Sequence, residues 1–245
     1  MRMQLKYKAE CLAERLAGRF GLEVFPRGEA PARHLHLDSY ASVVLSGSFV
    51  EAGFGGRVNV QPGDVLLHGE FDCHANSSTC SRSVTILNLP WREGWAEGHF
   101  RVCDPDLLVR LAEKDPRESM RALAAGLQPA HSASHHWTEI LASDLQTTTC
   151  PSLRRWARSF GMRPEALSRG FHREFGVSPK QYRLEARARN AWREVLKSPQ
   201  SLTTIAYELG FADLAHLSRS VRWLTGCSPS AWRSWARNSV QAQVP

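Results

Sequence analysis

An internal duplication in the last hundred residues restricts the possible folds of this chain more than any other feature. The segment LSRGFHREFGVSPKQYR, which begins at Leu167, is repeated as LSRSVRWLTGCSPSAWR from Leu217, at a constant offset of 50 residues. Upstream, LRRWARSFGM from Leu153 corresponds to LTTIAYELGF from Leu202 at an offset of 49. The two offsets agree if the second copy has one extra residue in its turn. The sequence therefore predicts two copies of one structural unit.

Each copy has the pattern of a short amphipathic helix, a turn containing glycine and a second amphipathic helix, which is the layout of a helix-turn-helix unit. The residues expected to be buried are Leu167 and Phe171 in the first copy, and Leu214, Leu217, Val221 and Leu224 in the second. The residues expected to face outward are Glu165, Ser168, Arg169 and His172 in the first copy, and Ala215, Ser218, Arg219 and Arg222 in the second. A helix that enters the major groove needs small or polar residues on its leading face, with donors such as arginine for guanine edges or phosphates. Both outward faces meet this requirement.

The segment between the copies, KQYRLEARARNAWREVLKS, predicts one long helix that ends at Ser198-Pro199. Its apolar stripe consists of Leu184, Ala188, Ala191 and Val195. A rigid helix between two reading units would hold their recognition helices at a fixed separation. Because major-groove faces on one side of DNA repeat every ~34 Å, a single chain would then engage two successive turns.

The charge distribution divides the chain into two parts. From Pro151 onward there are 16 Lys/Arg against 6 Asp/Glu, a net charge of +10, whereas the first 150 residues carry 15 against 18, a net charge of −3. A basic domain gains affinity for DNA by displacing counterions from the phosphates. The competing interpretation is an all-helical packing module whose arginines are merely solvated.

The first half of the chain has a different sequence pattern. Short runs rich in Val, Leu and Phe, punctuated by turns at GFGG (Gly53–Gly56) and PGD (Pro62–Asp64), predict a small antiparallel β-barrel or sandwich between Glu23 and about Pro90. Helical spacing is present over residues 4–20 and again from Asp104 to Asp144. The polar segment Thr147–Ser152 marks the expected main boundary. The predicted division is 1–103, a sensor domain; 104–146, a helical linker and dimerisation region; and 147–245, the DNA-binding domain.

Over about Leu153 to Arg237, the motifs LSRGFHREFGVSPKQYR and IAYELGFADLAHLSRSVRWLTGCSPSAWR resemble the AraC/XylS family of transcription regulators. The resemblance implies two helix-turn-helix subdomains joined by a long helix, and a protein that acts through RNA polymerase. By position, it implies base-reading roles for Arg163, Glu165, Ser168 and Arg169 in the first unit, and for Leu214, Ala215, Ser218 and Arg219 in the second. The family often has a polar residue where this chain has Leu214, so contact with a thymine methyl, or no direct reading, is expected there.

The β-rich segment resembles the cupin-like sensor domain that is common in this family. His34-Leu35-His36 and His74 occupy cupin-motif positions, so His34, His36 and His74 are candidate ligands for a divalent transition metal. The chain departs from the motif because Tyr40 stands where cupins have a metal-binding Glu. A small organic effector is the alternative occupant. The candidate ligand-binding residues are His34, His36, Tyr40, His68, Asp72 and His74, with Asn76 nearby.

The fold class predicted is α+β: an N-terminal cupin-like β-barrel, a helical linker, and an all-α C-terminal domain with two helix-turn-helix units. The main hypothesis is an effector-responsive transcription regulator that binds double-stranded DNA and RNA polymerase and is not an enzyme. A homodimer through the helices between Asp104 and Asp144 is expected from their Leu/Ala faces. No apolar run approaches the ~18 residues of a membrane span, and no signal peptide is recognisable, so a cytoplasmic protein without membrane contact is expected.

Two other functions stay open at this stage. The first is a cupin-type metal-dependent enzyme with a helical accessory domain, which would need metal on the His34, His36 and His74 set. The second is sequence-independent packaging of nucleic acid by the basic half, which the duplicated recognition faces disfavour because packaging needs only charge.

Overall fold

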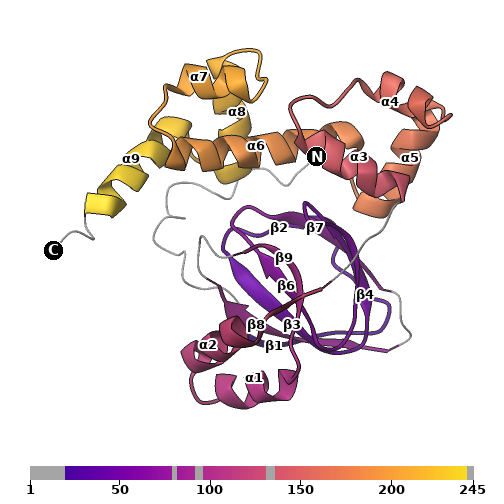
Figure 1. Cartoon of the computed structure of the whole chain (residues 1–245), viewed down its shortest axis with the longest axis vertical. Helices are drawn as coiled ribbons and strands as arrows, with labels where there is room; N and C mark the ends of the chain where they lie inside the picture. The colour runs from indigo at the N-terminus through magenta and orange to yellow at the C-terminus, as the bar shows by residue number, and fades with distance from the viewer. Residues whose placement is uncertain (1–19, 79–81, 92–95, 131–135, 242–245) are drawn as a thin grey trace.

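A computed structural model describes residues 20–78, 82–91, 96–130 and 136–241 of the chain (Figure 1). The helix predicted over residues 4–20 lies outside the described residues, apart from Phe20. Figure 1 shows a β-barrel with two helices on one side, and a row of helices that lies across its opposite end. The α+β fold class and the order of its parts are as the sequence predicts.

The barrel consists of two antiparallel sheets. The strands are β1 (Gly21–Phe25), β2 (His34–Leu35), β3 (Tyr40–Ser46), β4 (Phe49–Gly53), β5 (Gly56–Val60), β6 (Asp64–His68), β7 (Cys73–Ser78), β8 (Val84–Pro90), β9 (Gly98–Arg101) and β10 (Gln128–Pro129). One sheet has the order β1-β8-β3-β6-β9-β10 and the other the order β2-β7-β4-β5. The predicted turns are present, because Gly53 pairs with Gly56 at the end of the β4–β5 hairpin, and the backbone N–H of Asp64 donates to the carbonyl of Gln61 in the turn between β5 and β6.

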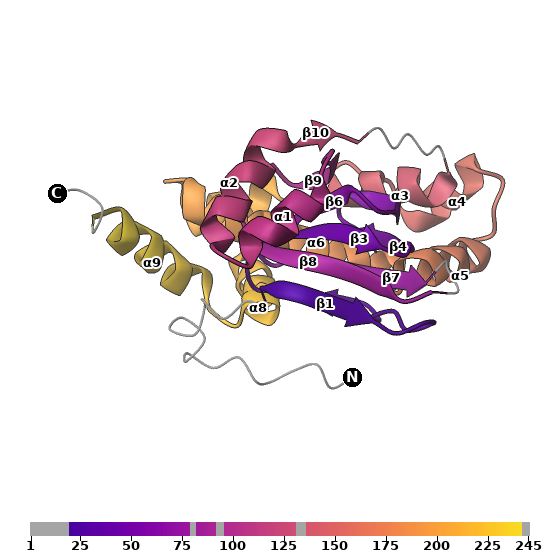
Figure 2. The ribbon, with the colours of Figure 1, turned by 90° about the horizontal axis from the view of Figure 1, so that it is seen from below.

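Two helices, α1 (Pro105–Ala112) and α2 (Pro116–Gly126), cover the outside of the six-stranded sheet (Figure 2). Each begins with an aspartate N-cap followed by proline, a combination that favours helix initiation. Leu108 and Leu123 are buried with Val65, Leu87 and Leu89 of the barrel. Part of the apolar surface on which the dimer prediction rests is therefore buried within the chain, whereas Leu107 of α1 is 39% exposed, and the dimer stays a prediction.

The remaining helices form two similar units. They are α3 (Trp137–Gln146), α4 (Leu153–Ser159), α5 (Pro164–Phe175), α6 (Pro179–Lys197), α7 (Leu202–Glu208), α8 (Leu214–Thr225) and α9 (Pro229–Gln241). Helix α3 packs in the first unit, since Leu141 and Leu145 share a core with Leu167, Phe171 and Tyr182.

The duplication inferred from sequence is present in the structure. Helices α4 and α7 correspond at an offset of 49 residues, whereas α5 and α8 correspond at 50, so the extra residue lies in the second turn. Gly161 and Gly210 have φ values of 64° and 68° in the two turns. Gly176 and Gly226 end α5 and α8 in the left-handed conformation, which glycine adopts with the least strain.

One residue prediction is wrong. Leu214 was expected in the core, but its side chain is 37% exposed, whereas Leu217, Val221 and Leu224 are buried as predicted. Leu214 is the first residue of α8, directly after the N-cap Asp213, and the first turn of the helix extends beyond the packed core. On α6, Ala188, Ala191 and Val195 are buried, and Leu184 is only half-buried.

The barrel supplies side chains to both helical cores. Phe71, from the loop between β6 and β7, packs edge-on against Trp192 of α6 with ring centroids 4.8 Å apart, and lies 5.9 Å from the ring of Trp232. Ala52, at the end of β4, lies in the core of the first unit. In Figures 1 and 2, α6 accordingly crosses the barrel end. Among the described helices, none combines the length and apolar character that a membrane crossing requires.

Candidate functional site

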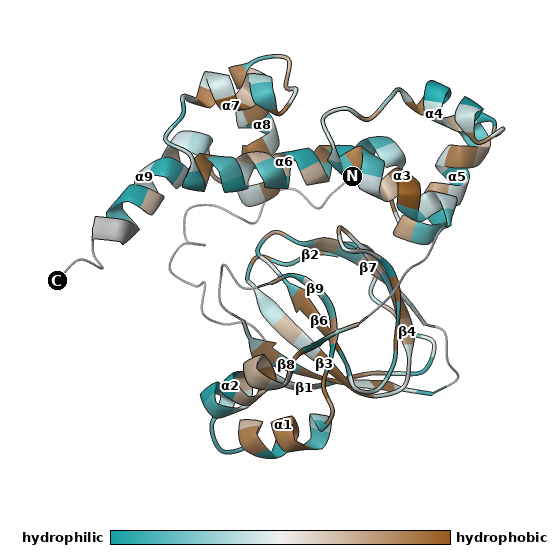
Figure 3. Ribbon diagram, in the orientation of Figure 1, coloured by the Kyte–Doolittle hydropathy of each residue, from teal (hydrophilic) through white to brown (hydrophobic). Residues whose placement is uncertain are grey.

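The outward faces of α5 and α8 carry the residues that the sequence predicts for DNA contact. Exposed residues are Arg163, Glu165, Arg169 and His172 on the first unit, and Leu214, Ala215, Arg219 and Arg222 on the second. Ser168 and Ser218 are half-buried at the edge of each face. Buried residues lie opposite, with Leu167, Phe171, Leu217 and Val221 all at 0% exposure. Figure 3 shows hydrophilic and hydrophobic residues interspersed along the helices of both units.

The two faces differ in their surrounding charge, which the sequence analysis did not single out. Helix α4 exposes Arg154, Arg155 and Arg158, and the side chain of Arg173 on α5 is 80% exposed. The equivalent helix in the second unit, α7, has no basic residue. In the sequence, this difference is visible in the run LRRWARS, which forms α4 and contains three arginines. The first unit can therefore make more phosphate contacts, which add affinity without reading bases.

A second site lies inside the barrel. The pocket between the two sheets has a cavity volume of about 70 Å³ and is partly open to solvent. Its polar lining comprises Glu23, Glu29, His34, His36, Tyr40, Ser42, Glu51, His68, His74, Asn76 and Asn88. Neighbouring strands bring these side chains to one interior, because His34 pairs with His74 in register and Tyr40 pairs with His68.

Two sets of three side chains in this pocket have the spacing of a metal site, with their ligand atoms within 4.8 Å of one another. One is the predicted set, His34, His36 and His74. The other consists of Glu51, His68 and His74, and all three of its residues are buried. The predicted ligand residues His34, His36, Tyr40, His68 and His74 thus line one pocket.

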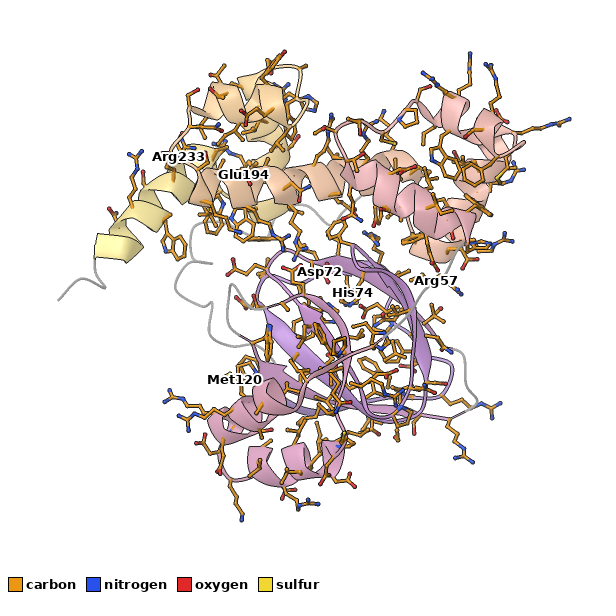
Figure 4. All side chains as sticks on the ribbon, viewed as in Figure 1. Arg57, Asp72, His74, Met120, Glu194 and Arg233 are labelled. Atoms are coloured by element: carbon orange, nitrogen blue, oxygen red, sulfur yellow. The ribbon has the colours of Figure 1, made fainter. Side chains whose placement is uncertain are left out.

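Asp72 lies behind the imidazoles rather than in this pocket. Its Oδ2 atom is 2.8 Å from Nδ1 of His68 and 3.4 Å from Nδ1 of His74. In Figure 4, Asp72 and His74 lie at the end of the barrel that faces α6. Glu51 was not predicted, and its only sequence signal is a carboxylate within an otherwise apolar strand, FVEAG.

Burial and mutual contact shift the ionisation of this cluster. Burial, together with the imidazoles of His74 and His34, lowers the pKa of His36 to about 2. Burial also opposes the charged form of His68, but Glu51 and the hydrogen bond to Asp72 outweigh it and raise the His68 pKa. Burial and the carboxylates of Glu51 and Asp72 raise the pKa of Tyr40 well above its ordinary value. Tyr40 therefore remains a neutral phenol, whose oxygen lies 2.9 Å from Nε2 of His36.

Sequence comparisons match the C-terminal helices. Residues 156–234 match the family of helix-turn-helix domains. The virulence regulon transcriptional activator VirF of Yersinia enterocolitica is 33% identical over 81 residues, which are 33% of this chain and 30% of that protein. The transcriptional regulator ExsA of Pseudomonas aeruginosa is 35% identical over 81 residues, 33% of this chain and 29% of that protein. The matched segment thus spans under a third of either relative.

Solved structures include similar chains. Fatty-acid-bound ToxT from Vibrio cholerae has 11% sequence identity and a TM-score of 0.38, and the match covers 87% of this chain and 93% of that one. An AraC-type DNA-binding regulator from Chromobacterium violaceum has 24% identity and a TM-score of 0.35, covering 38% of this chain and 83% of that one.

Proposed function

We propose that this chain, whose C-terminal helices form a helix-turn-helix domain of the AraC type, is a sequence-specific DNA-binding transcription regulator with a ligand-responsive barrel. The observation that carries the proposal is the duplicated unit, in which α5 and α8 each expose a small and polar face with an arginine at the same position, Arg169 and Arg219. The match of residues 156–234 to the helix-turn-helix family, and the named regulators that are similar over 81 residues, support it.

In this proposal, Arg163, Glu165, Ser168, Arg169 and His172 read one major-groove segment, and Leu214, Ala215, Ser218, Arg219 and Arg222 read the next. The exposed arginines of α4 add phosphate contacts. The protein acts in the bacterial cytoplasm, where the DNA is, and influences RNA polymerase. The proposal keeps the division that the sequence predicts, into a sensor domain to about residue 103, a helical linker to 146 and a DNA-binding domain beyond it, with α3 of the linker packed in the core of the first unit.

A homodimer is part of the proposal, on a different surface from the one expected. Because Leu108 of α1 and Leu123 of α2 are buried against the barrel, the edge strand β1 is the better candidate. Leu22 and Val24 of this strand are 58% and 59% exposed, and among the strands that the structure describes β1 pairs with β8 alone. Sedimentation at micromolar concentration tests the dimer, and a monomer there would contradict it.

The test of DNA recognition is a titration of the purified chain on its own upstream region, with random competitor DNA and at two salt concentrations. Arg169→Ala and Arg219→Ala are each expected to weaken specific binding by ~1–3 kcal/mol if they contact base edges. The matched control is Arg110→Ala, since this arginine is exposed on α1, against the other side of the barrel. Equal losses on specific and random DNA would assign the arginines to phosphates. An absence of binding even at low salt would overturn the proposal.

The arrangement of Glu51, His68 and His74 favours one alternative function, that of a metal-dependent enzyme. Two imidazoles and one carboxylate beside an open pocket are the ligand pattern of catalytic iron and zinc sites. The DNA titration separates the alternatives, because an enzyme with a helical accessory domain would show no competitor-resistant binding.

A further inference from the structure

The strongest unexplained arrangement in the molecule is the convergence of three buried groups from both sheets. His68, at the end of β6, and His74, on β7, each place Nε2 3.7 Å from the same oxygen of Glu51, Oε2. In a tetrahedral zinc site with ligand bonds of 2.0–2.1 Å, ligand atoms are separated by about 3.3 Å. A contraction of a few tenths of an ångström would bring each imidazole within coordinating range of an ion shared with Glu51.

Asp72 prepares both imidazoles for this role. Its Oδ2 atom lies within hydrogen-bond distance of Nδ1 on His68 and His74. When a carboxylate accepts the Nδ1 proton of a histidine, the opposite nitrogen, Nε2, presents its lone pair, and this is the usual outer arrangement around a metal-bound histidine. One aspartate here orients two histidines toward one carboxylate oxygen.

The three histidines that the cupin motif predicts are less suited to binding a metal ion than Glu51, His68 and His74. His34, His36 and His74 include no carboxylate, and two of the three are only half-buried. The Nε2 atom of His36 is already in contact with the Tyr40 hydroxyl. Tyr40, which occupies the motif's carboxylate position, stacks on His68 with ring centroids 4.4 Å apart. Glu51 therefore supplies, from another strand, the negative charge that the motif lacks.

We propose that Glu51, His68 and His74 bind one divalent transition metal ion, oriented by Asp72. Among divalent transition metals, zinc and iron are suited to a combination of imidazole and carboxylate ligands. The ion would leave at least one coordination position facing the pocket, where His34 and His36 line the wall.

The loop that carries Asp72 connects this site to the DNA-binding helices. Arg189 of α6 donates from Nε to the carbonyl of Glu70 at 2.8 Å, and its Nη1 lies 3.8 Å from Asp72. Phe71, between them, is buried against Trp192. Drawing His68 and His74 onto an ion would therefore shift or rigidify the same four-residue loop, 69–72, on which α6 rests. This regulatory step rests on the proposed function, whereas the metal site does not.

The metal site is tested on the full-length protein without DNA. Protein stripped with a chelator is titrated with Zn²⁺ alone by calorimetry, and Co²⁺ is used in parallel for its visible absorption. We expect one ion per chain, and a loss of tenfold or more in Zn²⁺ affinity for Glu51→Gln and for His68→Gln. Asp72→Asn should lower the affinity about 10–100-fold, as removal of an outer-shell partner does.

His34→Gln is the matched control, because it removes an imidazole from the same pocket and belongs only to the other set. It should retain the wild-type affinity. A wild type that binds neither ion at micromolar concentration would overturn the site, as would a His34→Gln loss equal to that of His68→Gln. Circular dichroism of each variant checks folding, and Glu51→Gln and His68→Gln test the site independently if one of them does not fold.

The regulatory step is tested by the DNA titration with and without Zn²⁺. Zn²⁺ is expected to change the affinity of the wild type at least fivefold, the lower range of allosteric coupling. Arg189→Ala should retain Zn²⁺ binding but lose this change. If the wild type binds Zn²⁺ but its DNA affinity does not change, only the regulatory step would be refuted. A chain that binds no DNA under either condition would refute the proposed function and leave the calorimetric result standing.

Discussion

The contact between Arg33 and Glu185 allows a quantitative test of how the barrel is held against the helices. Nη2 and Nε of Arg33 lie 2.8 and 3.0 Å from Oε2 of Glu185 on α6, and the two side chains are only 7% and 8% exposed. Arg33 also donates to the carbonyls of Ala52 and Phe175, whereas Glu185 has one further donor among the described residues, the Gln181 amide. Removing one partner of a buried ion pair costs ~3–5 kcal/mol, because the other charge is left uncompensated.

The unequal number of remaining partners predicts unequal effects. Arg33→Ala leaves a buried carboxylate with one neutral donor, so it should lower the free energy of unfolding by about 4–5 kcal/mol. Glu185→Ala leaves a guanidinium with two carbonyl partners, so its cost should be nearer ~3 kcal/mol. The double variant should cost less than the sum of the two, with a coupling energy of ~0.5–3 kcal/mol.

Urea denaturation followed by tryptophan fluorescence and circular dichroism measures these values. Because barrel residues lie in both helical cores, a single transition is expected for the wild type. Arg57→Ala is the control, since its ion pair with Glu174 joins the same two parts but is 38% and 25% exposed, and such pairs contribute under ~1 kcal/mol. If the Arg33→Ala effect were equally small, or if the wild type unfolded in two separate transitions, the reasoning would be refuted.

Four further changes test other features of the fold. Phe71→Ala should lower the free energy of unfolding by ~3–5 kcal/mol, as buried Phe-to-Ala changes do, and should shift the tryptophan emission to longer wavelength because Trp192 becomes accessible to water. Gly161→Ala should cost ~1–2 kcal/mol through strain at positive φ, in a turn where the new methyl group meets open space. Gly176→Ala should cost more in the same urea assay, because its methyl group would also lie 3.2 Å from Ala75 and 3.3 Å from Arg33 of the barrel; equal costs for the two glycines would contradict the docking of α5. Ser178→Ala should cost ~1 kcal/mol by removing the hydroxyl that accepts from Gln181 N at the start of α6, and an unchanged melting midpoint would contradict this capping role.

The helical half was the most predictable from sequence, because its information is local and present twice. A difference of one between two offsets located the extra residue in the second turn, and glycine at corresponding positions fixed the ends of the helices. Leu214 shows the limit of this reasoning. Its spacing from Leu217 fits a helix face, but a residue in the first turn can point beyond the core, and the end of the core cannot be read from periodicity.

The barrel site was only half predictable for a different reason. His34, His36 and His74 were found through a sequence motif, and a motif identifies only residues within the segments that it spans. Glu51 reaches the same interior from β4, through a register with β7 in which it lies opposite Asn76. Nothing within SFVEAG indicates that pairing, because it depends on contacts between residues distant in the chain. Likewise, the burial of Leu108 and Leu123 against the barrel could not be foreseen, because sequence does not show which surface a helix covers; the dimer assigned to these helices stays a prediction.

Helix α6 combines an apolar stripe, which can be predicted from local spacing, with buried charged residues, whose partners are distant in the chain. Ala188, Ala191 and Val195 face the second helix-turn-helix core, as their spacing predicts. Glu185 and Arg189, four residues apart, are buried as well, at 6% and 3% exposure, and both pair with the barrel. Buried charges stabilise a protein little compared with apolar residues of the same size, but they restrict which partners and which register are acceptable. Two opposite charges at a fixed separation on α6 therefore specify one seating of the helix on the barrel. Because α6 also spaces the two recognition helices, any change in that seating acts on both units at once.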